Sequence, residues 1–339
     1  MYENKTILIT GGAGYIGSHT CIELLNANYE VVVVDNLSNS SEESIKRVEL
    51  ITNCKIPFYN EDVNDKRALH RIFQENKIDA VIHFAGYKSA GESIDFPLSY
   101  YSNNIGTTIS ILKAMKENNC NKIVFSSSAA VYGNPEKLPI KEQSTLLALN
   151  PYAQSKLIIE QVLKDVYASD SNHSIAILRY FNPIGAHNSG MIGENPTGTP
   201  NNLVPYISQV AAGKRKFVKV FGGDYNTIDG TGVRDFIHVV DLARGHVKAL
   251  DALWSMPKFL IANLGTGRGY SVLQVIQEFE KASGINIPFT ILPRRDGDVA
   301  ESYSDPGFAE DEIGWKVEYD LKKMCKDAWY WQKMNPNGY

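Results

Sequence analysis

The sequence predicts an α/β protein in which a doubly wound parallel sheet is combined with a smaller, loop-rich α/β lobe. Short apolar strands alternate with amphipathic helices through the first half of the 339 residues, a rhythm typical of parallel sheets covered by helices. A glycine-rich turn joins the first strand to the first helix. After residue 180 the chain becomes richer in Gly, Pro and Asn, and its elements become shorter.

The first strand and the first helix flank this glycine turn. Residues 6–10, Thr-Ile-Leu-Ile-Thr, have the composition of a strand buried on both faces. Gly11, Gly12, Gly14 and Gly17 follow, and a helical pattern begins near Tyr15. Glycines permit close backbone approach, and free N–H groups at a helix N-terminus can bind the phosphates of a dinucleotide. A turn with a purely structural role remains an alternative, because the spacing differs from the common G-x-G-x-x-G.

An acidic residue supports the nucleotide interpretation. The apolar run at 31–34 ends at Asp35, about 20 residues after the turn, where a carboxylate can bind the ribose hydroxyls of adenosine. Residues 36–40 contain no Arg or Lys that would bind a 2′-phosphate. The sequence therefore predicts a Rossmann-type site for NAD rather than NADP.

The remaining elements of the first half follow in order. Asp62 either bonds the adenine amino group or caps the helix after it. His83 lies on an apolar run and is interpreted as a core residue. We expect a nucleotide-binding domain at 1–180 and a second lobe at 181–339, with some segments of the lobe returning to the first domain. The expected elements are helices near 42–51, 65–76, 97–118 and from 151, and strands at 56–59, 79–84 and 122–125.

The composition argues against several classes of function. With 34 basic and 38 acidic residues the net charge is −4, and no basic run offers a site for nucleic acid or a membrane surface. The four cysteines form no C-x-x-C pair, which predicts free thiols in a reducing cytoplasm. The His residues lack the spacing of metal ligands, and no stretch is long enough to span a bilayer. We expect no metal, nucleic-acid or membrane partner.

Tyr152 and Lys156 are the most specific chemical signal. They lie four residues apart at the start of a predicted helix and project from one face of it. A tyrosine with its usual pKa near 10 is a poor base, but a neighbouring ammonium and a positively charged nicotinamide ring would stabilise the phenolate. Ser128, just after a strand, can share the hydrogen bond to the reacting hydroxyl. A surface Tyr and Lys are the alternative, which the preceding glycine turn and Asp35 make less favoured.

Together these residues resemble the UDP-glucose 4-epimerase family of extended short-chain dehydrogenases/reductases. The likeness runs nearly end to end. The motifs that show it include TGGAGYIGSHT at 10–20, FSSSAAVYG at 125–133, NPYAQSK at 150–156, FGGDYNTIDGTGVRDFIHVVDLA at 221–243 and RRDGD at 294–298.

The resemblance implies a tightly bound NAD that is not consumed. Tyr152 is implied as the base that takes the proton from the hydroxyl on carbon 4 of the sugar, with Ser128 assisting. Lys156 is implied to hold the nicotinamide ribose. The implied cofactor-binding residues are Gly11, Gly14, Tyr15, Ile16, Gly17, Asp35, Asn36, Leu37, Ser38, Asn39, Ser40, Asp62, Val63, Phe84, Ala85, Gly86, Lys88, Asn103, Ser128, Tyr152, Lys156 and Phe181.

The resemblance also implies UDP-hexose substrates held by the second lobe. Two arginines, Arg234 and Arg295, are the expected partners of the diphosphate, because planar guanidinium groups bind its oxygens in pairs. The implied substrate-binding residues are Lys88, Ser128, Tyr152, Asn182, Asn202, Leu203, Lys219, Val220, Phe221, Arg234, Arg295, Asp298 and Ser302.

Ser302 departs from part of the family. Members restricted to unacetylated sugars carry a bulky Tyr four residues after the Asp of R-x-G-D, and here that position is Ser302. A small residue leaves room for an N-acetyl group, so we expect UDP-GlcNAc and UDP-GalNAc to be interconverted as well. A small loop residue without consequence is the alternative.

Two further points concern the competing functions and the assembly of the protein. A dehydratase or decarboxylase on the same scaffold, or a non-catalytic NAD-binding protein, are the competing functions. The resemblance implies a homodimer formed through the helices around 97–118 and 151–169. The apolar positions Ile105, Ile109, Leu112 and Met115 fit such a face but could equally pack on the sheet.

Overall fold

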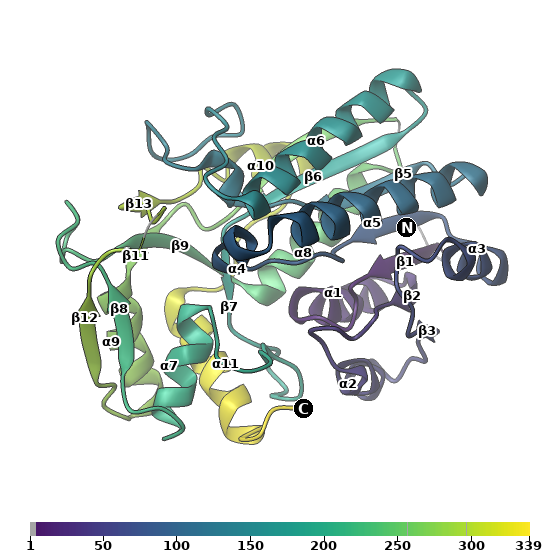
Figure 1. The fold of residues 1–339 in the computed structure, drawn as a ribbon. Helices are drawn as coiled ribbons and strands as arrows, with labels where there is room; N and C mark the ends of the chain where they lie inside the picture. Colours follow the sequence, from purple (N-terminus) through teal and green to yellow (C-terminus); the bar gives the residue numbers. More distant parts are fainter. Residues whose placement is uncertain (1–4, 256, 296) are drawn as a thin grey trace.

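A seven-stranded parallel sheet forms the centre of the larger lobe (Figure 1). The computed structural model describes residues 5–255, 257–295 and 297–339. All neighbouring strands of this sheet run parallel, which confirms the predicted fold class. In spatial order the strands are β10 (Phe259–Leu264), β6 (Ser174–Tyr180), β5 (Lys122–Ser126), β4 (Ala80–His83), β1 (Thr6–Thr10), β2 (Glu30–Val34) and β3 (Phe58–Tyr59).

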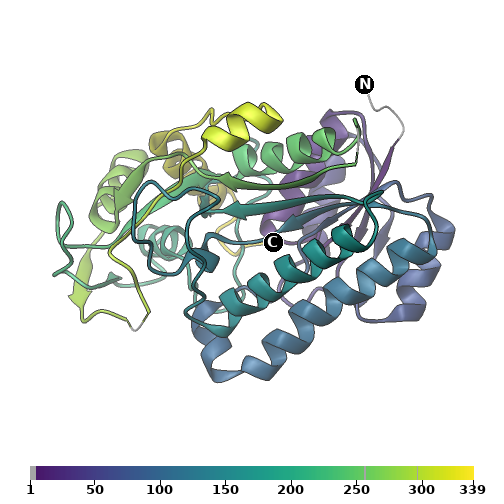
Figure 2. The same cartoon turned by 90° about the horizontal axis from the view of Figure 1, so that it is seen from above.

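Helices cover both faces of the sheet (Figure 2). Ile7 and Ile9 of β1 belong to the core beneath one layer and Leu8 to the core beneath the other, as the alternation of side chains along a strand requires. The first layer contains α1 (Tyr15–Asn26), α2 (Glu42–Thr52), α8 (Val239–Ala252) and α10 (Gly307–Ile313). The second contains α3 (Lys66–Glu75), α5 (Pro97–Glu117) and α6 (Pro151–Ser169).

Two short elements differ from the sequence predictions. β3 begins at residue 58 rather than 56, since Pro57 has no N–H to donate and contributes only its carbonyl, which accepts from Val33. A six-residue helix, α4 (Ala90–Asp95), was not expected. It begins at the capping hydroxyl of Ser89. A 3-10 turn, η1 (Ala129–Tyr132), follows β5.

The smaller lobe has two sheets of its own. Its helices and strands share a core that includes Phe236, Phe279 and Met324. One sheet joins β7 (Asn182–Ile184), β9 (Val233–His238), β11 (Gly269–Ser271) and β13 (Glu301–Ser302), and the other pairs β8 (Val218–Phe221) with β12 (Phe289–Leu292). The helices are α7 (Leu203–Ala211), α9 (Val272–Ser283) and α11 (Leu321–Met334).

The chain passes between the two lobes more than once. After β9 in the smaller lobe it returns to form α8, which packs on α1, and then β10, the edge strand of the large sheet. Residues beyond 180 therefore contribute to the nucleotide-binding half. None of the helices in the described parts of the chain is long and apolar enough to cross a membrane.

Candidate active site

A cavity of about 600 Å³ lies beyond the carboxyl ends of the strands of the large sheet. In doubly wound folds this edge is where ligands bind. Its walls come from the loops after β1, β2, β3 and β4, from the start of α6, and from the segment 193–202 of the smaller lobe. The site therefore lies between the two lobes.

The glycine turn forms one wall of this cavity. Gly11 has a φ of +70°, and a Cβ added there would lie 2.8 Å from the backbone nitrogen of Ala85. Gly14 precedes α1 without a capping side chain, so the first N–H groups of the helix have no partner within it. Backbone donors at an uncapped helix N-terminus, on a turn that admits no side chain, fit the pyrophosphate of a dinucleotide.

Asp35 is held rigidly at the end of β2. Its carboxylate accepts from the backbone nitrogens of Ala13 (3.0 Å) and Leu37 (2.9 Å) and from the Ser40 hydroxyl (2.8 Å). It also lines the cavity, and a carboxylate can accept about four hydrogen bonds. Asp35 can therefore bind a ribose hydroxyl in addition to ordering its own turn.

The structure bears on the sequence alternatives for two nearby residues, Asp62 and His83. Asp65, not Asp62, caps α3, and Asp62 lines the cavity instead. His83 is buried, with its ring nitrogens 2.7 Å from the Thr10 hydroxyl and 3.0 Å from that of Thr108. Burial lowers the pKa of His83 to about 3. The interpretation of His83 as a core residue is thus confirmed.

Tyr152 and Lys156 project from the first turns of α6 into the cavity. The Lys156 ammonium donates to the Ser126 carbonyl at 2.8 Å and lies 4.8 Å from the centre of the Phe125 ring. Burial lowers the pKa of Lys156 to about 8, against an opposing effect of the Glu160 charge. Burial raises the pKa of Tyr152 well above its usual value, while a hydrogen bond with Ser128 lowers it. Burial therefore favours the neutral phenol form of Tyr152.

A buried ion pair lies on α6 and β6, next to Lys156. Arg179 of β6 donates two hydrogen bonds to the Glu160 carboxylate, at 3.0 and 2.6 Å. Glu160, one turn after Lys156, also accepts from the Ser127 hydroxyl at 2.6 Å. The network thereby links α6 to the strand end that carries Ser128.

A second group of predicted residues lies in the smaller lobe. Arg295 donates to Asp298 at 3.0 Å and stacks over the Phe221 ring at 4.5 Å. Arg234 lies 3.9 Å from the same aspartate and pairs in register with Ser302 of β13. Burial lowers the pKa of Arg234, while Asp298 raises it. The structure thus brings together two arginines, an acid and an aromatic ring that are up to 77 residues apart in the chain.

Some of the predicted site residues line the large cavity and others lie outside its lining. Those lining the large cavity are Gly11, Gly14, Tyr15, Ile16, Gly17, Asp35, Asn36, Ser38, Asn39, Ser40, Asp62, Val63, Phe84, Ala85, Gly86, Lys88, Asn103, Tyr152, Lys156 and Asn202. Those outside its lining are Leu37, Ser128, Phe181, Asn182, Leu203, Lys219, Val220, Phe221, Arg234, Arg295, Asp298 and Ser302. Of these, Phe181 and Val220 are buried in hydrophobic cores.

Sequence reasoning missed two side chains near the site. Asn104 is buried in α5, where it accepts from the backbone of Tyr87 (2.8 Å) and donates to the Ser155 hydroxyl (3.0 Å), so it holds the loop after β4 against α6. Its polar side chain interrupts an amphipathic pattern, and this was the only available signal. Glu194 lies in an irregular segment and contacts Lys88, 106 residues away, for which no local pattern exists.

Comparison with known proteins identifies the family. The profile of the NAD dependent epimerase/dehydratase family matches residues 7–265. The chain belongs to this family. With the uncapped helix and glycine turn described above, this membership makes NAD its cofactor. The protein is similar to the UDP-glucose 4-epimerases of Bacillus subtilis (strain 168) and Dictyostelium discoideum, at 56% and 55% identity over 98% of this chain and 98% and 97% of theirs.

A solved relative shows the same architecture. The crystal structure of UDP-glucose 4-epimerase from Bifidobacterium longum, in complex with NAD+ and UDP, matches with a TM-score of 0.96 and 52% identity. The match covers 99% of this chain and all of that one.

Proposed function

We propose that this family member is an isomerase that interconverts UDP-glucose and UDP-galactose by epimerisation at carbon 4 of the hexose. The observation that carries the proposal is that Tyr152 and Lys156 line the same cavity as the glycine turn. The similarity to UDP-glucose 4-epimerases over nearly the whole chain supports the substrate.

The chemistry that bound NAD supplies is the reversible acceptance of a hydride from carbon 4. Tyr152 takes the proton of the hydroxyl on that carbon and later returns it. The Ser128 hydroxyl, whose interaction lowers the pKa of Tyr152, supports the phenolate. Lys156, held by the Ser126 carbonyl, lines the same cavity as Tyr152 and can bind the nicotinamide ribose. A positive charge near the phenol favours the phenolate. The positive charge of a bound nicotinamide ring acts against the effect of burial on the Tyr152 phenol.

Epimerisation further requires that the 4-keto sugar rotate in the site, so that the hydride returns to its opposite face. The Arg234 and Arg295 cluster of the smaller lobe supports this step, because two guanidinium groups can hold the diphosphate while the hexose stays free. Binding energy from the nucleotide then retains the intermediate without fixing the sugar. In this scheme residues 1–180 bind NAD, and the lobe within 181–339 binds the UDP-sugar.

One experiment separates this function from its alternatives. Purified protein is incubated with UDP-galactose without added cofactor, and the products are followed by NMR. We expect UDP-glucose. A 4-keto-6-deoxy product would favour a dehydratase, although η1 after Ser128 carries no acid in residues 129–132. Absence of turnover with NAD bound would indicate a non-catalytic NAD-binding protein.

We also propose activity on the N-acetylated pair UDP-GlcNAc and UDP-GalNAc. Ser302 is partly buried in β13, next to Arg234 of β9. Its small side chain supports the proposal, because a hydroxymethyl group occupies far less space than a tyrosine ring. Side-by-side measurement of both epimerisations tests it.

A homodimer and a cytoplasmic location complete the proposal. The exposed side chains of Leu98 and Ile109 on α5 support a partner surface there, whereas Met115 is buried on the sheet. Sedimentation tests the dimer. The four cysteines are all free thiols, which supports a reducing compartment.

A further inference from the structure

Glu194 lies where the two lobes meet over the large cavity. It belongs to the irregular segment between β7 and α7, and its side chain is only 9% exposed. Its Oε1 atom is 3.4 Å from the ammonium of Lys88, in the loop after β4, and 2.7 Å from the amide nitrogen of Asn202, which precedes α7. One carboxylate therefore contacts a side chain from each lobe.

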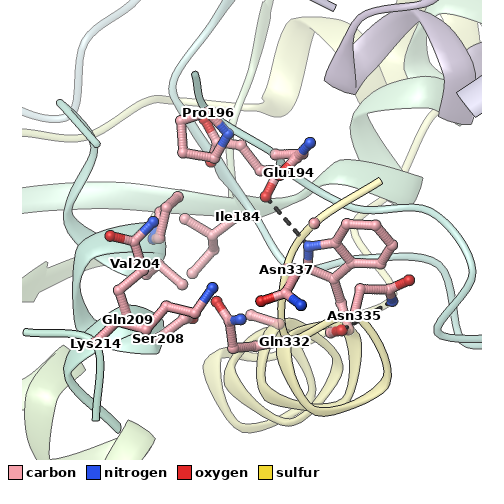
Figure 3. A pocket seen from close by; sticks show the side chains of 16 residues that line it. Ile184, Glu194, Pro196, Val204, Ser208, Gln209, Lys214, Gln332, Asn335 and Asn337 are labelled. Carbon is pink, nitrogen blue, oxygen red and sulfur yellow. Dashed lines mark hydrogen bonds between the residues drawn. The ribbon is translucent and has the colours of Figure 1, made fainter. Parts of the chain in front are cut away.

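The backbone of this segment is anchored from the opposite side. The Trp331 indole of α11 donates to the Glu194 carbonyl at 3.2 Å (Figure 3). A Cβ added at Gly193 would lie 2.5 Å from the same indole, so the chain packs directly on the ring. Glu194 and Pro196 also border a second cavity of about 180 Å³, and Figure 3 shows them on the side opposite Gln332 and Asn337. The carboxylate is thus held by a fixed backbone.

The Glu194 carboxylate constrains the orientation of its two partners, Asn202 and Lys88. An ionised carboxylate only accepts hydrogen bonds, so Asn202 must turn its amide nitrogen toward Glu194 and its carbonyl oxygen away. The side chain of Lys88 is 60% exposed, and ion pairing with Glu194 restricts the position of its ammonium. Both partners line the large cavity. Glu194 therefore determines where this wall offers an acceptor and where it offers a cation.

We propose that Glu194 is a positioning residue for the sugar nucleotide. It fixes the amide of Asn202 and the ammonium of Lys88 in the orientation that binds the substrate, and it thereby joins the two lobes around the ligand. The inference rests on the proposed function, since it assigns Glu194 a part in binding the UDP-hexose. Glu194 itself takes no part in the proton transfer at Tyr152.

The substitution Glu194→Gln tests this role. It preserves the volume of the side chain, removes the charge that attracts Lys88, and lets Asn202 bond in either amide orientation. We expect KM for UDP-galactose to rise about tenfold, with kcat within about threefold of wild type and the content of bound NAD unchanged. In a Lys88→Met background the same substitution should have a smaller effect on KM, because one of its two partners is already absent.

Glu49→Gln is the matched control. Glu49 is a partly buried glutamate that pairs with Lys55 at 2.8 Å and accepts a backbone hydrogen bond, but it lies in α2 outside the cavity lining. Its replacement should leave KM unchanged. An unchanged KM in Glu194→Gln, or a parallel loss of kcat, bound NAD and melting temperature, would overturn the positioning role. A wild-type chain without epimerase activity would overturn the proposed function together with this inference.

Discussion

The substitution Gly17→Ala tests how the first helix presents its N–H groups to the cofactor. A Cβ at Gly17 would lie 2.7 Å from the Cα of Gly12 and closer still to the carbonyl oxygen of Gly11. The first distance is about 0.7 Å short of the 3.4 Å at which ordinary contact begins. Both obstacles are backbone atoms of the turn, so the start of α1 must move away from it.

The size of the effect follows from two opposing terms. Alanine is favoured over glycine in a helix by about 1 kcal/mol, whereas inserting a methyl group into a filled site costs about 1–3 kcal/mol. The net change in stability is therefore a loss of up to about 2 kcal/mol. The displacement of the N–H groups should weaken NAD binding more strongly, by about tenfold to a hundredfold.

The assay is the NAD content per chain after gel filtration, together with the melting temperature. Gly91→Ala is the control, because a Cβ there meets nothing within 4 Å in α4. It should retain NAD and melt at or slightly above the wild-type temperature. If Gly17→Ala retained wild-type NAD content and stability, contact between α1 and the glycine turn would not position the cofactor.

Three further predictions concern the reaction, and a fourth concerns stability. Tyr152→Phe should lower kcat by about 10²–10⁴-fold while NAD stays bound; steady-state rates and NAD content check this, and a near-normal rate would exclude Tyr152 as the base. Ser302→Tyr should abolish turnover of UDP-GlcNAc and spare UDP-galactose; equal loss of both activities would contradict the proposed role of Ser302. Because the pKa of Lys156 is lowered to about 8 from its usual 10.5, its charge is lost as pH rises through 8, and kcat/KM should decline there. Between those two pKa values Lys156 is protonated in the unfolded chain but not in the folded one, so its contribution to stability should rise with pH. Melting temperatures of the wild type and Lys156→Met across that pH range measure this contribution. A contribution that fell with pH would contradict the burial of Lys156.

The regular half of the fold was predictable because its signals are local. β1, β2, α5 and α6 begin and end within a few residues of the predicted bounds, since apolar runs, glycines and Pro97 or Pro151 at the helix starts mark them directly. α4 was missed because a short helix with Gly91 in its first turn carries no periodic signal. The exact partner of β10 was also beyond the sequence, because an apolar strand does not indicate which sheet it joins.

The site was predictable in two different ways. The glycine turn and Asp35 follow from residue chemistry next to strand ends, and Tyr152 and Lys156 follow from their spacing at the start of a helix. The structure places all of them around one cavity. The smaller-lobe residues, such as Arg234, came only from family resemblance. Neither residue chemistry nor family resemblance pointed to Glu194, because its role depends on contacts between residues far apart in the chain.

In the proposed reaction the hydride leaves carbon 4 of the hexose and returns to the same carbon within one site. UDP-galactose carrying deuterium at carbon 4, incubated with the purified protein in ordinary water without added NAD, tests it directly. We predict that NMR and mass spectrometry will find the deuterium retained at carbon 4 of UDP-glucose. Replacement of the deuterium by solvent hydrogen would contradict hydride transfer and would require a different mechanism for inversion.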